Sequence, residues 1–260
     1  MYKGVAIWNY AGDAVENAEK FWKAGFDAVS WNAPLFVDRY NDDQRERVAE
    51  YLKRSKQYFT MHNLLPSPYD PEEQASARHA WKVISEWNSR HHLLKGMTFD
   101  FWNPHEDQLP LYRECMDVFQ GQNVFFACED TPLNARTMEK FAKYINPGDD
   151  VGILIDLGHM NVRQWMMEEH EHDDFMRVFR QLPMKLRELH VHDNKGRRDE
   201  HREVGYGNLP MKAIVDATKS IGFDGIVTVE IVNSQQWTID EHISHALDTS
   251  DRFFSLVEWT

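Results

Sequence analysis

The stretch VFFACEDTPLNARTMEKFAKYINPGDDVGILID, residues 124–156, decides the fold because it holds a complete strand–helix–strand unit. Its ends, VFFACE (124–129) and VGILID (151–156), are short apolar runs typical of fully buried strands. Residues 134–145 between them have a helical pattern, and NPGDD (146–150) places a glycine where a helix ends before the next strand. Such a unit predicts two parallel strands connected by a helix that covers one face of their sheet.

The same alternation of short apolar runs and longer helical patterns continues along the whole chain. The other apolar runs are residues 4–8, 26–31, 58–62, 96–100, 186–192 and 225–230. The other helical patterns are residues 13–24, 42–55, 71–90, about 107–120, 161–181, 209–221 and 240–258. Eight strand–helix units in a chain of 260 residues match the size of a closed barrel. We therefore predict an α/β protein with a single (β/α)8 TIM barrel domain spanning residues 1–260.

An open, doubly wound parallel sheet is the alternative arrangement of such units. It would normally have a glycine-rich phosphate loop after its first strand. Here the first strand runs into WNYAGD (8–13), which has no such loop. No stretch of the chain has the composition of a linker between domains, and the single barrel is favoured.

The charge of the chain constrains its partners and its location. Its 42 acidic and 29 basic residues give a formal net charge of −13, which argues against a nucleic-acid partner because such binding depends on lysine and arginine. Neither a signal peptide nor an apolar stretch of the roughly 20 residues that span a bilayer is apparent. We expect a soluble cytoplasmic protein that acts on a small molecule, without a membrane partner, and a homo-oligomer is compatible with the sequence.

Ionisable residues end six consecutive expected strands, the third to the eighth. They are His62, Asp100, Glu129, Asp156, either His190 or His192, and Glu230. Because active sites of such barrels lie at the carboxyl ends of the strands, we expect these side chains to share one mouth. Two carboxylates about 4 Å apart repel by roughly 4 kcal/mol at an effective dielectric constant near 20. A group of three must therefore protonate, spread apart or share a cation.

Three of these carboxylates, Glu129, Asp156 and Glu230, end apolar strands, and a histidine from the seventh strand adds a nitrogen ligand. Three oxygens and one nitrogen suit a divalent metal such as Mn²⁺, Co²⁺, Zn²⁺ or Mg²⁺ with an open coordination position. A site rich in carboxylates and without thiolates is typical of a catalytic metal.

Simpler roles remain open for several of these residues. A strand-end aspartate such as Asp156 commonly caps the following helix. His62 and Asp100 can be pocket-lining or capping residues, and His159 can face the cavity or cap the sixth helix. The basic tract KGRR (195–198) is either a substrate or anion contact or an exposed loop.

Five motifs of the second half give the chain a family resemblance. They are ACED (127–130), LIDLGHMN (154–161), LHVHDN (189–194), DEHREVGYGNL (199–209) and GFDGIVTVE (222–230). In this order they resemble the xylose isomerase-like TIM barrel superfamily, which includes sugar isomerases and epimerases and the endonuclease IV enzymes (AP endonuclease family 2). The first half matches mainly in its general pattern, with GFDAVSW (25–31) and TMHN (60–63).

The resemblance implies a set of metal ligands. The four ligands of the superfamily would fall on Glu129, Asp156, His190 and Glu230. His190 is preferred because the ligand histidine of the family stands three residues before an acidic position, here Asp193. His192 is then expected to point to the other side of the strand.

The endonuclease IV branch has further zinc ligands, and these also find counterparts that are candidates for a second metal or for substrate contacts. His159, Asp199 and His201 correspond to a second cluster, and His62 to a third. Asp100 stands where that branch has a histidine. This departure, the acidic charge and the short loops argue against a nuclease.

The resemblance implies a metal-dependent isomerase or epimerase acting on a small sugar or keto-sugar, with Glu129 and Glu230 as paired acid and base. A keto-sugar lyase or dehydratase on the same metal site is one alternative, and an endonuclease IV-like zinc phosphodiesterase is another. The expected substrate contacts include three tryptophans near strand tips and two arginines, namely Trp8, Trp31, Trp102, Arg197 and Arg198.

Overall fold

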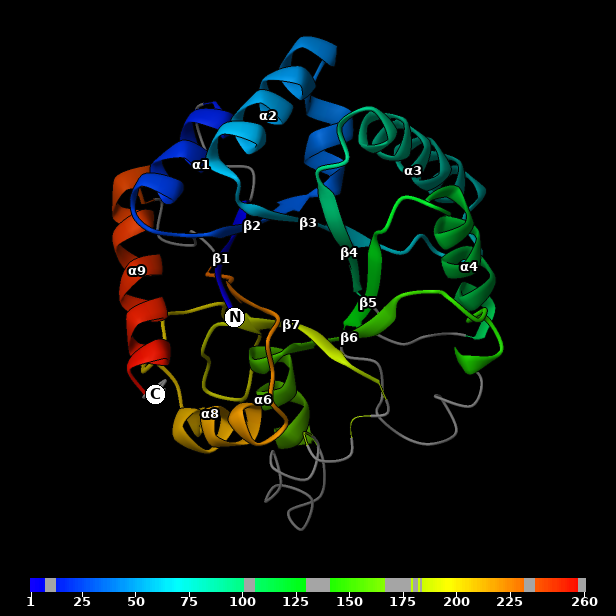
Figure 1. Cartoon of the computed structure of the whole chain (residues 1–260). Coiled ribbons are helices and arrows are strands. Elements are labelled where there is room, and N and C mark those ends of the chain that lie inside the picture. Colours follow the sequence, from blue (N-terminus) through cyan, green and yellow to red (C-terminus); the bar gives the residue numbers. More distant parts are fainter. Residues whose placement is uncertain are drawn as a thin grey trace.

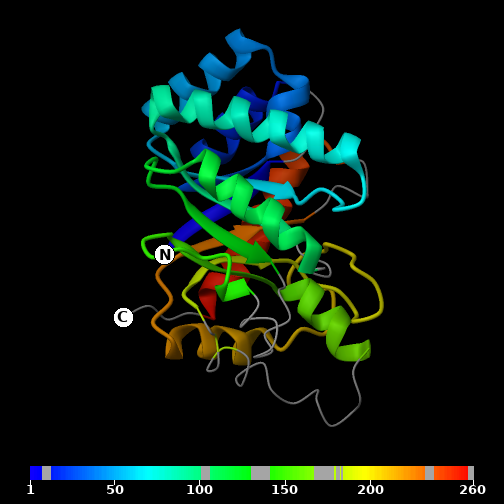
Figure 2. The same cartoon turned by 90° about the vertical axis from the view of Figure 1, so that its right-hand side faces the viewer.

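The computed structural model describes residues 1–7, 13–100, 106–129, 141–166, 179, 182, 184–231 and 237–256. In this part of the chain, eight parallel strands close into a barrel in the order β1 to β8, and β8 pairs with β1. Figure 1 looks along the barrel and shows the ring of strands inside a layer of helices, and Figure 2 shows it from the side. The predicted (β/α)8 TIM barrel is confirmed.

The elements follow the predicted boundaries closely. The strands are β1 (Tyr2–Ile7), β2 (Ala28–Asn32), β3 (Tyr58–Leu64), β4 (Leu94–Asp100), β5 (Phe125–Glu129), β6 (Val151–Asp156), β7 (Leu186–Val191) and β8 (Ile226–Val229). The helices are α1 (Ala14–Lys23), α2 (Asp42–Ser55), α3 (Pro71–His91), α4 (Leu109–Val118), α6 (Leu157–Met166), α8 (Met211–Ser220) and α9 (Ile239–Ser255), with a short π-helix η1 (Leu35–Arg39) and a 3-10 helix η2 (Glu106–Gln108). None of the helices in the described ranges is long and apolar enough to cross a membrane.

Side-chain capping explains where several helices begin. The Asp13 carboxylate accepts hydrogen bonds from the backbone N–H groups of Val15 and Glu16 at the start of α1. Reciprocal capping boxes open α2 and α9, and Asp70 precedes α3, which has a proline in its first turn. These caps satisfy N–H groups that a helix start leaves without partners.

The sixth helix differs from the prediction because α6 starts at Leu157, directly after β6, and not at residue 161. Asp156 Oδ1 accepts a hydrogen bond of 2.7 Å from the backbone N–H of His159, which stabilises the helix start at this point. Most of the expected fifth helix (134–145) and the second half of the expected sixth helix lie outside the described residues.

The barrel interior changes from apolar to polar along its axis. Near the amino-terminal ends of the strands, Ala28, Phe125 and Ile226 pack together in a small apolar cluster. Further along, buried polar side chains such as Thr60 and Thr228 face the interior, and the ionisable strand ends follow. The larger apolar core lies between the barrel and its helices.

His242 in α9 makes the stability of the fold sensitive to acid. Its side chain is 1% exposed and lies edge-on to the rings of Phe21 and Trp237. Burial, assisted by His245 and opposed by Glu203, lowers its pKa from 6.5 to about 4.

We therefore expect the native protein to hold His242 neutral while the unfolded chain binds a proton as the pH falls below 6.5. The contribution to the free energy of unfolding is complete above pH 6.5 and is lost by pH 4, and it amounts to at most about 3 kcal/mol. Urea unfolding between pH 7 and pH 4.5 should show a smaller acid loss for His242→Gln than for the wild type. His79→Gln, at an exposed histidine, is the control, and equal acid losses in all three proteins would contradict the prediction.

Candidate metal centre

The four predicted ligands of the first metal lie together at the carboxyl ends of β5 to β8. His190 Nδ1 lies 2.6 Å from Glu230 Oε2, 3.7 Å from Asp156 Oδ2 and 3.8 Å from Glu129 Oε2. All four side chains are buried, with the most exposed, Glu230, at 3%. Neighbouring parallel strands in register deliver them, since Asp156 pairs directly with His190.

The electrostatics of this group show that it needs a positive charge. Burial would lower the pKa of His190, but the Glu230 carboxylate outweighs it and raises that pKa well above its ordinary value. Burial would likewise raise the pKa of Glu230, but the His190 imidazolium lowers it to about 2. In the metal-free protein the protonated His190 therefore supplies the charge that balances the carboxylates.

The donor set fits a divalent cation. Among the described residues, both ring nitrogens of His190 are buried without a hydrogen bond of ordinary geometry, although three carboxylates surround Nδ1. A cation between them would satisfy Nδ1 and neutralise the carboxylates at once. Asp156 caps α6 with Oδ1, while its Oδ2 lies 3.7 Å from His190 Nδ1. The helix cap is therefore compatible with the predicted ligand position.

A second group of potential ligands adjoins the first. Asp199 Oδ2 lies 3.0 Å from His159 Nε2 and 2.8 Å from His201 Nε2. The ring of His192 stacks on that of His201, with centroids 3.9 Å apart. The ligand atoms of these four residues lie within 4.8 Å of one another. His159 connects the two groups, because its Nδ1 lies 2.9 Å from Glu129 Oε1.

Charge also organises the second group. Burial would raise the pKa of Asp199, but the hydrogen bonds from His159 and His201 lower it well below its ordinary value. Burial would lower the pKa of His201, but the Asp199 carboxylate raises it to about 9. His201 also places Nδ1 at 2.9 Å from the backbone carbonyl oxygen of Glu230, which ties the loop to the end of β8.

The orientation expected for His192 is wrong. Its Nε2 lies 2.8 Å and 2.9 Å from the two carboxylate oxygens of Asp156, so His192 points into the site as His190 does. Residues two apart on a strand face the same side, and that period was the signal that could have found His192.

The loop that carries Asp199 and His201 is organised by Asp193, which is 1% exposed. The Asp193 carboxylate accepts hydrogen bonds from the backbone N–H groups of Asn194, Gly205, Gly207 and Leu209. Backbone hydrogen bonds in both directions between Asp193 and Arg202 also close the loop. The acidic position after His190 is therefore a loop anchor that sequence reasoning did not identify.

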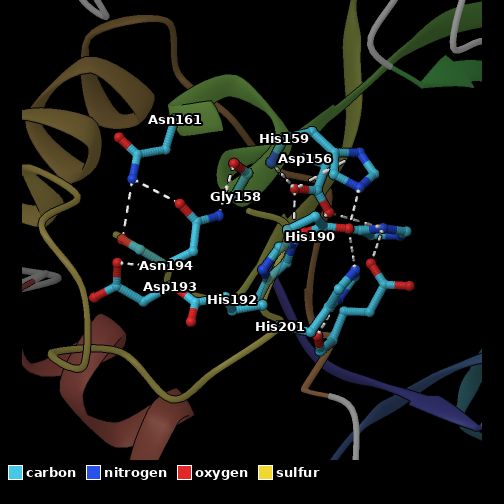
Figure 3. Close-up of polar contacts among 12 residues, drawn as sticks. Asp156, Gly158, His159, Asn161, His190, His192, Asp193, Asn194 and His201 are labelled. Atoms are coloured by element: carbon cyan, nitrogen blue, oxygen red, sulfur yellow. Dashed lines mark hydrogen bonds and ion pairs between the residues drawn. The ribbon is translucent and has the colours of Figure 1, made fainter. Parts of the chain in front are cut away.

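Asn194 continues this network toward α6, as Figure 3 shows. Its side-chain amide donates to the Gly158 carbonyl oxygen, and its side-chain oxygen accepts from Asn161 Nδ2. Asn161 Nδ2 also donates to Asn208 Oδ1 at the far end of the loop. The loop and the start of α6 are thus held as one unit.

The lack of a side chain at Gly158 leaves room for the ring of His192. A Cβ atom at Gly158 would lie 1.9 Å from Cε1 of His192, so Gly158→Ala is expected to displace a buried ring. We expect a loss of about 1–3 kcal/mol in the free energy of unfolding, although alanine favours a helix over glycine by about 1 kcal/mol.

The second variant of this test removes the ring. When His192→Ala is added, Gly158→Ala should no longer cause a clash and should raise the free energy of unfolding through the higher helix propensity of alanine. Urea unfolding of the two single variants and the double variant measures the coupling free energy between the two positions. Additive effects of the two changes would contradict the clash.

His62 and Asp100 lie at the same end of the barrel. His62 Nε2 is 3.5 Å from Glu129 Oε2, and its Nδ1 is 2.8 Å from Thr98 Oγ1. Burial, assisted by the nearby His190, lowers the pKa of His62 to about 4, so this ring is neutral near pH 7. Asp100 is half-buried and is paired in register with Glu129.

In the described part of the chain, the structure does not bring the expected substrate contacts together with the candidate metal ligands as it does the ligands themselves. Trp31 is fully buried in the core outside the barrel, edge-on to Tyr40 and Phe59, and does not reach the mouth. Arg197 and Arg198 are exposed on the loop, and Trp8 and Trp102 lie outside the described residues. The small pocket beside the candidate ligands is lined by Ala6, Ile7, Ser30, Asn32, His62, His190 and Glu230.

The alternation of side chains along β2 explains the position of Trp31. Ser30 and Asn32 line the pocket, so Trp31 between them must face the helices. The prediction that Trp31 contacts the substrate required the inner face of β2, and the structure places this side chain on the outer face.

Comparisons with known proteins agree with this architecture. The model of a family described as xylose isomerase-like TIM barrel matches residues 18–252. A D-psicose 3-epimerase from Clostridium cellulolyticum, solved with D-tagatose, superposes with a TM-score of 0.68 at 20% identity, over 96% of this chain and 92% of that chain. A 3-keto-D-glucoside 4-epimerase from E. coli superposes with a TM-score of 0.68 at 14% identity, over 97% of this chain and 99% of that chain.

A curated relative matches only in part. An uncharacterized protein of Methanocaldococcus jannaschii is 31% identical over 84 residues, which are 32% of this chain and 27% of that relative. The match thus spans about a quarter of the relative's length.

Proposed function

The chain belongs to the xylose isomerase-like TIM barrel family, and from this premise we propose that it is a divalent-metal-dependent isomerase or epimerase of a small sugar or keto-sugar. The observation that carries the proposal is the convergence of three buried carboxylates on His190 Nδ1 at the barrel mouth. The two structural neighbours are a D-psicose 3-epimerase and a 3-keto-D-glucoside 4-epimerase, which agrees with this reaction class.

Glu129, Asp156, His190 and Glu230 would hold the metal. When bound, a divalent cation such as Mn²⁺, Co²⁺, Zn²⁺ or Mg²⁺ would polarise adjacent substrate oxygens and stabilise the charge that develops when a C–H proton is lost. The protein groups have the complementary task of moving that proton.

Glu129 and Glu230 are the proton-transfer pair of this proposal. Glu230 is a buried carboxylate beside His190; an adjacent cation would keep it ionised, so that it can accept a proton from the substrate carbon. Glu129 ends β5, three strands around the barrel from β8, and can return a proton to the opposite face. His159, with Nδ1 at Glu129 and Nε2 at Asp199, offers a route for protons between Glu129 and the loop.

A panel of substrates tests the proposal. Purified protein is assayed on ketoses, keto-sugars and keto-acids with and without EDTA, and re-supplied with Mn²⁺, Co²⁺, Zn²⁺ or Mg²⁺. Interconversion of a sugar that stops with EDTA supports the isomerase or epimerase. Loss of water or a carbon fragment from the same substrates would instead identify a lyase or dehydratase on the same site.

The second group of ligands favours one further candidate, an endonuclease IV-like zinc phosphodiesterase. His159, Asp199 and His201, with His192 beside them, could hold additional zinc ions. Asp100 and the net charge of −13 argue against this activity. Metal analysis of protein purified without chelators separates the two candidates, since about one ion per chain favours the isomerase and about three zinc ions with cleavage of an abasic-site oligonucleotide favour the phosphodiesterase.

A further inference from the structure

Glu188 is a buried carboxylate that the proposed reaction does not use. It lies on β7, two residues before His190, and is fully buried inside the barrel. Its Oε1 accepts a hydrogen bond of 2.5 Å from Thr228 Oγ1 on β8. Within the described ranges, its Oε2 is buried without a hydrogen bond. A carboxylate in an apolar barrel costs several kcal/mol unless it is paired, so its presence calls for a partner.

The neighbouring strand leaves room for this pair. A Cβ atom at Gly4 would lie 2.8 Å from Ile226 Cγ2 and 3.0 Å from Thr228 Oγ1. Glycine on β1 therefore lets Thr228 turn its hydroxyl toward Glu188 across the barrel interior. Thr228 thus holds the Glu188 carboxylate by a hydrogen bond, and Gly4 leaves the space that Thr228 needs.

His190 is the partner that the geometry offers. Its Nε2 lies 3.5 Å from Glu188 Oε1, a long contact, while its Nδ1 faces the three carboxylates of the candidate metal centre. The imidazole thus lies between Glu188 on the interior side and the proposed ligands on the mouth side. Metal-binding histidines commonly donate their second ring N–H to a carboxylate, which fixes the ring and the nitrogen that faces the metal.

Two other histidines of the site are held in a comparable way. His62 places Nδ1 against Thr98 Oγ1 and turns Nε2 toward Glu129. His201 places Nδ1 against a backbone carbonyl oxygen and turns Nε2 toward Asp199. In each ring one nitrogen is anchored to the protein framework and the other faces the candidate ligand groups.

We propose that Glu188 is a positioning residue that accepts the Nε2–H of His190 and thereby holds Nδ1 toward the metal. This inference rests on the proposed metal centre. Without the carboxylate, the imidazole can turn over about its Cβ–Cγ bond and exchange the two nitrogens. Loss of such an outer carboxylate typically weakens metal binding by about 10–100-fold.

Two variants of Glu188 test the proposal. Glu188→Leu removes the acceptor and fills the space with an apolar side chain, which a barrel interior tolerates. Glu188→Gln keeps an oxygen acceptor and should restore part of the effect. Thr60→Val is the control, because it removes another fully buried polar group of the barrel interior and should leave metal binding unchanged.

The readouts are the dissociation constant for Co²⁺, from competition with a chromophoric chelator, and the visible absorption spectrum of the Co²⁺-loaded protein. We expect Glu188→Leu to weaken Co²⁺ binding by about 10–100-fold and to alter the spectrum, with Glu188→Gln between it and the wild type. A purely structural role would change the urea midpoint and leave the affinity and the spectrum of the folded variant as in the wild type. That result would overturn the proposal.

The outcome separates this inference from the proposed function. Wild-type protein that binds Co²⁺ with the expected dependence on Glu188 but converts no sugar would support the positioning role and overturn the isomerase proposal. Wild-type protein that binds no Co²⁺ would overturn both.

Discussion

Replacing Glu129 with glutamine is expected to lower kcat for sugar interconversion by about 10²–10⁴-fold, the range for loss of a general acid–base group. Glutamine keeps an oxygen that can face the metal but cannot accept a proton. The loss should therefore appear mainly in kcat, and KM should change less. Steady-state kinetics of Glu129→Gln and Glu230→Gln with the metal-loaded protein measure this effect.

Isotope exchange makes this prediction sharper. If the two glutamates serve opposite faces of the substrate, each single variant should still exchange the C–H proton of one epimer with deuterium from solvent, while interconversion stops. Glu50→Gln, at an exposed glutamate of α2, is the control for folding and charge. A kcat within threefold of the wild type for Glu129→Gln would remove Glu129 from the proton-transfer pair.

Stripping the metal is expected to abolish turnover and to lower the thermal stability of the protein. The buried carboxylates repel one another when only His190 balances them, and a bound cation relieves that repulsion. A ligand present at 1,000 times its dissociation constant stabilises the native state by about 4 kcal/mol. For a protein of this size that corresponds to a rise in Tm of roughly 10 °C.

Differential scanning calorimetry with EDTA and with Mn²⁺ or Co²⁺ measures this shift. Asp156→Asn is the matched variant, since it should retain the cap of α6 while it loses a charged ligand, and its Tm should respond less to metal. A wild-type Tm and turnover that ignore both EDTA and added metal would refute a metal centre at these residues.

The barrel and its carboxylate tips were accessible from the sequence because apolar strands run directly into Glu129, Asp156 and Glu230. The position of a residue on the inner or outer face was harder to predict. For Trp31 the two-residue period of β2 leaves two possible faces, and the closed barrel shows that the side chain takes the outer one. For His192 the period was sufficient, because His190 two residues earlier faces the site.

Interactions between distant backbone segments could not be predicted in this way. Asp193 binds N–H groups up to 16 residues away, and nothing in its local sequence distinguishes it from a solvated aspartate. Glu188 is likewise hidden, because its importance depends on Thr228 from the next strand and on the ring of His190.

The anchoring of the loop by Asp193 has a consequence for how the substrate preference of such a protein can change. One carboxylate joins the two stems of the loop, near Asn194 and near Gly205. Between these stems, residues 195–198, with Arg197 and Arg198 exposed, can therefore be exchanged or lengthened at little cost to the barrel, provided that Asp199 and His201 keep their contacts with the site. Grafting alternative segments in place of residues 195–198 offers a route to new substrate preferences while the candidate ligands at the strand ends stay unchanged.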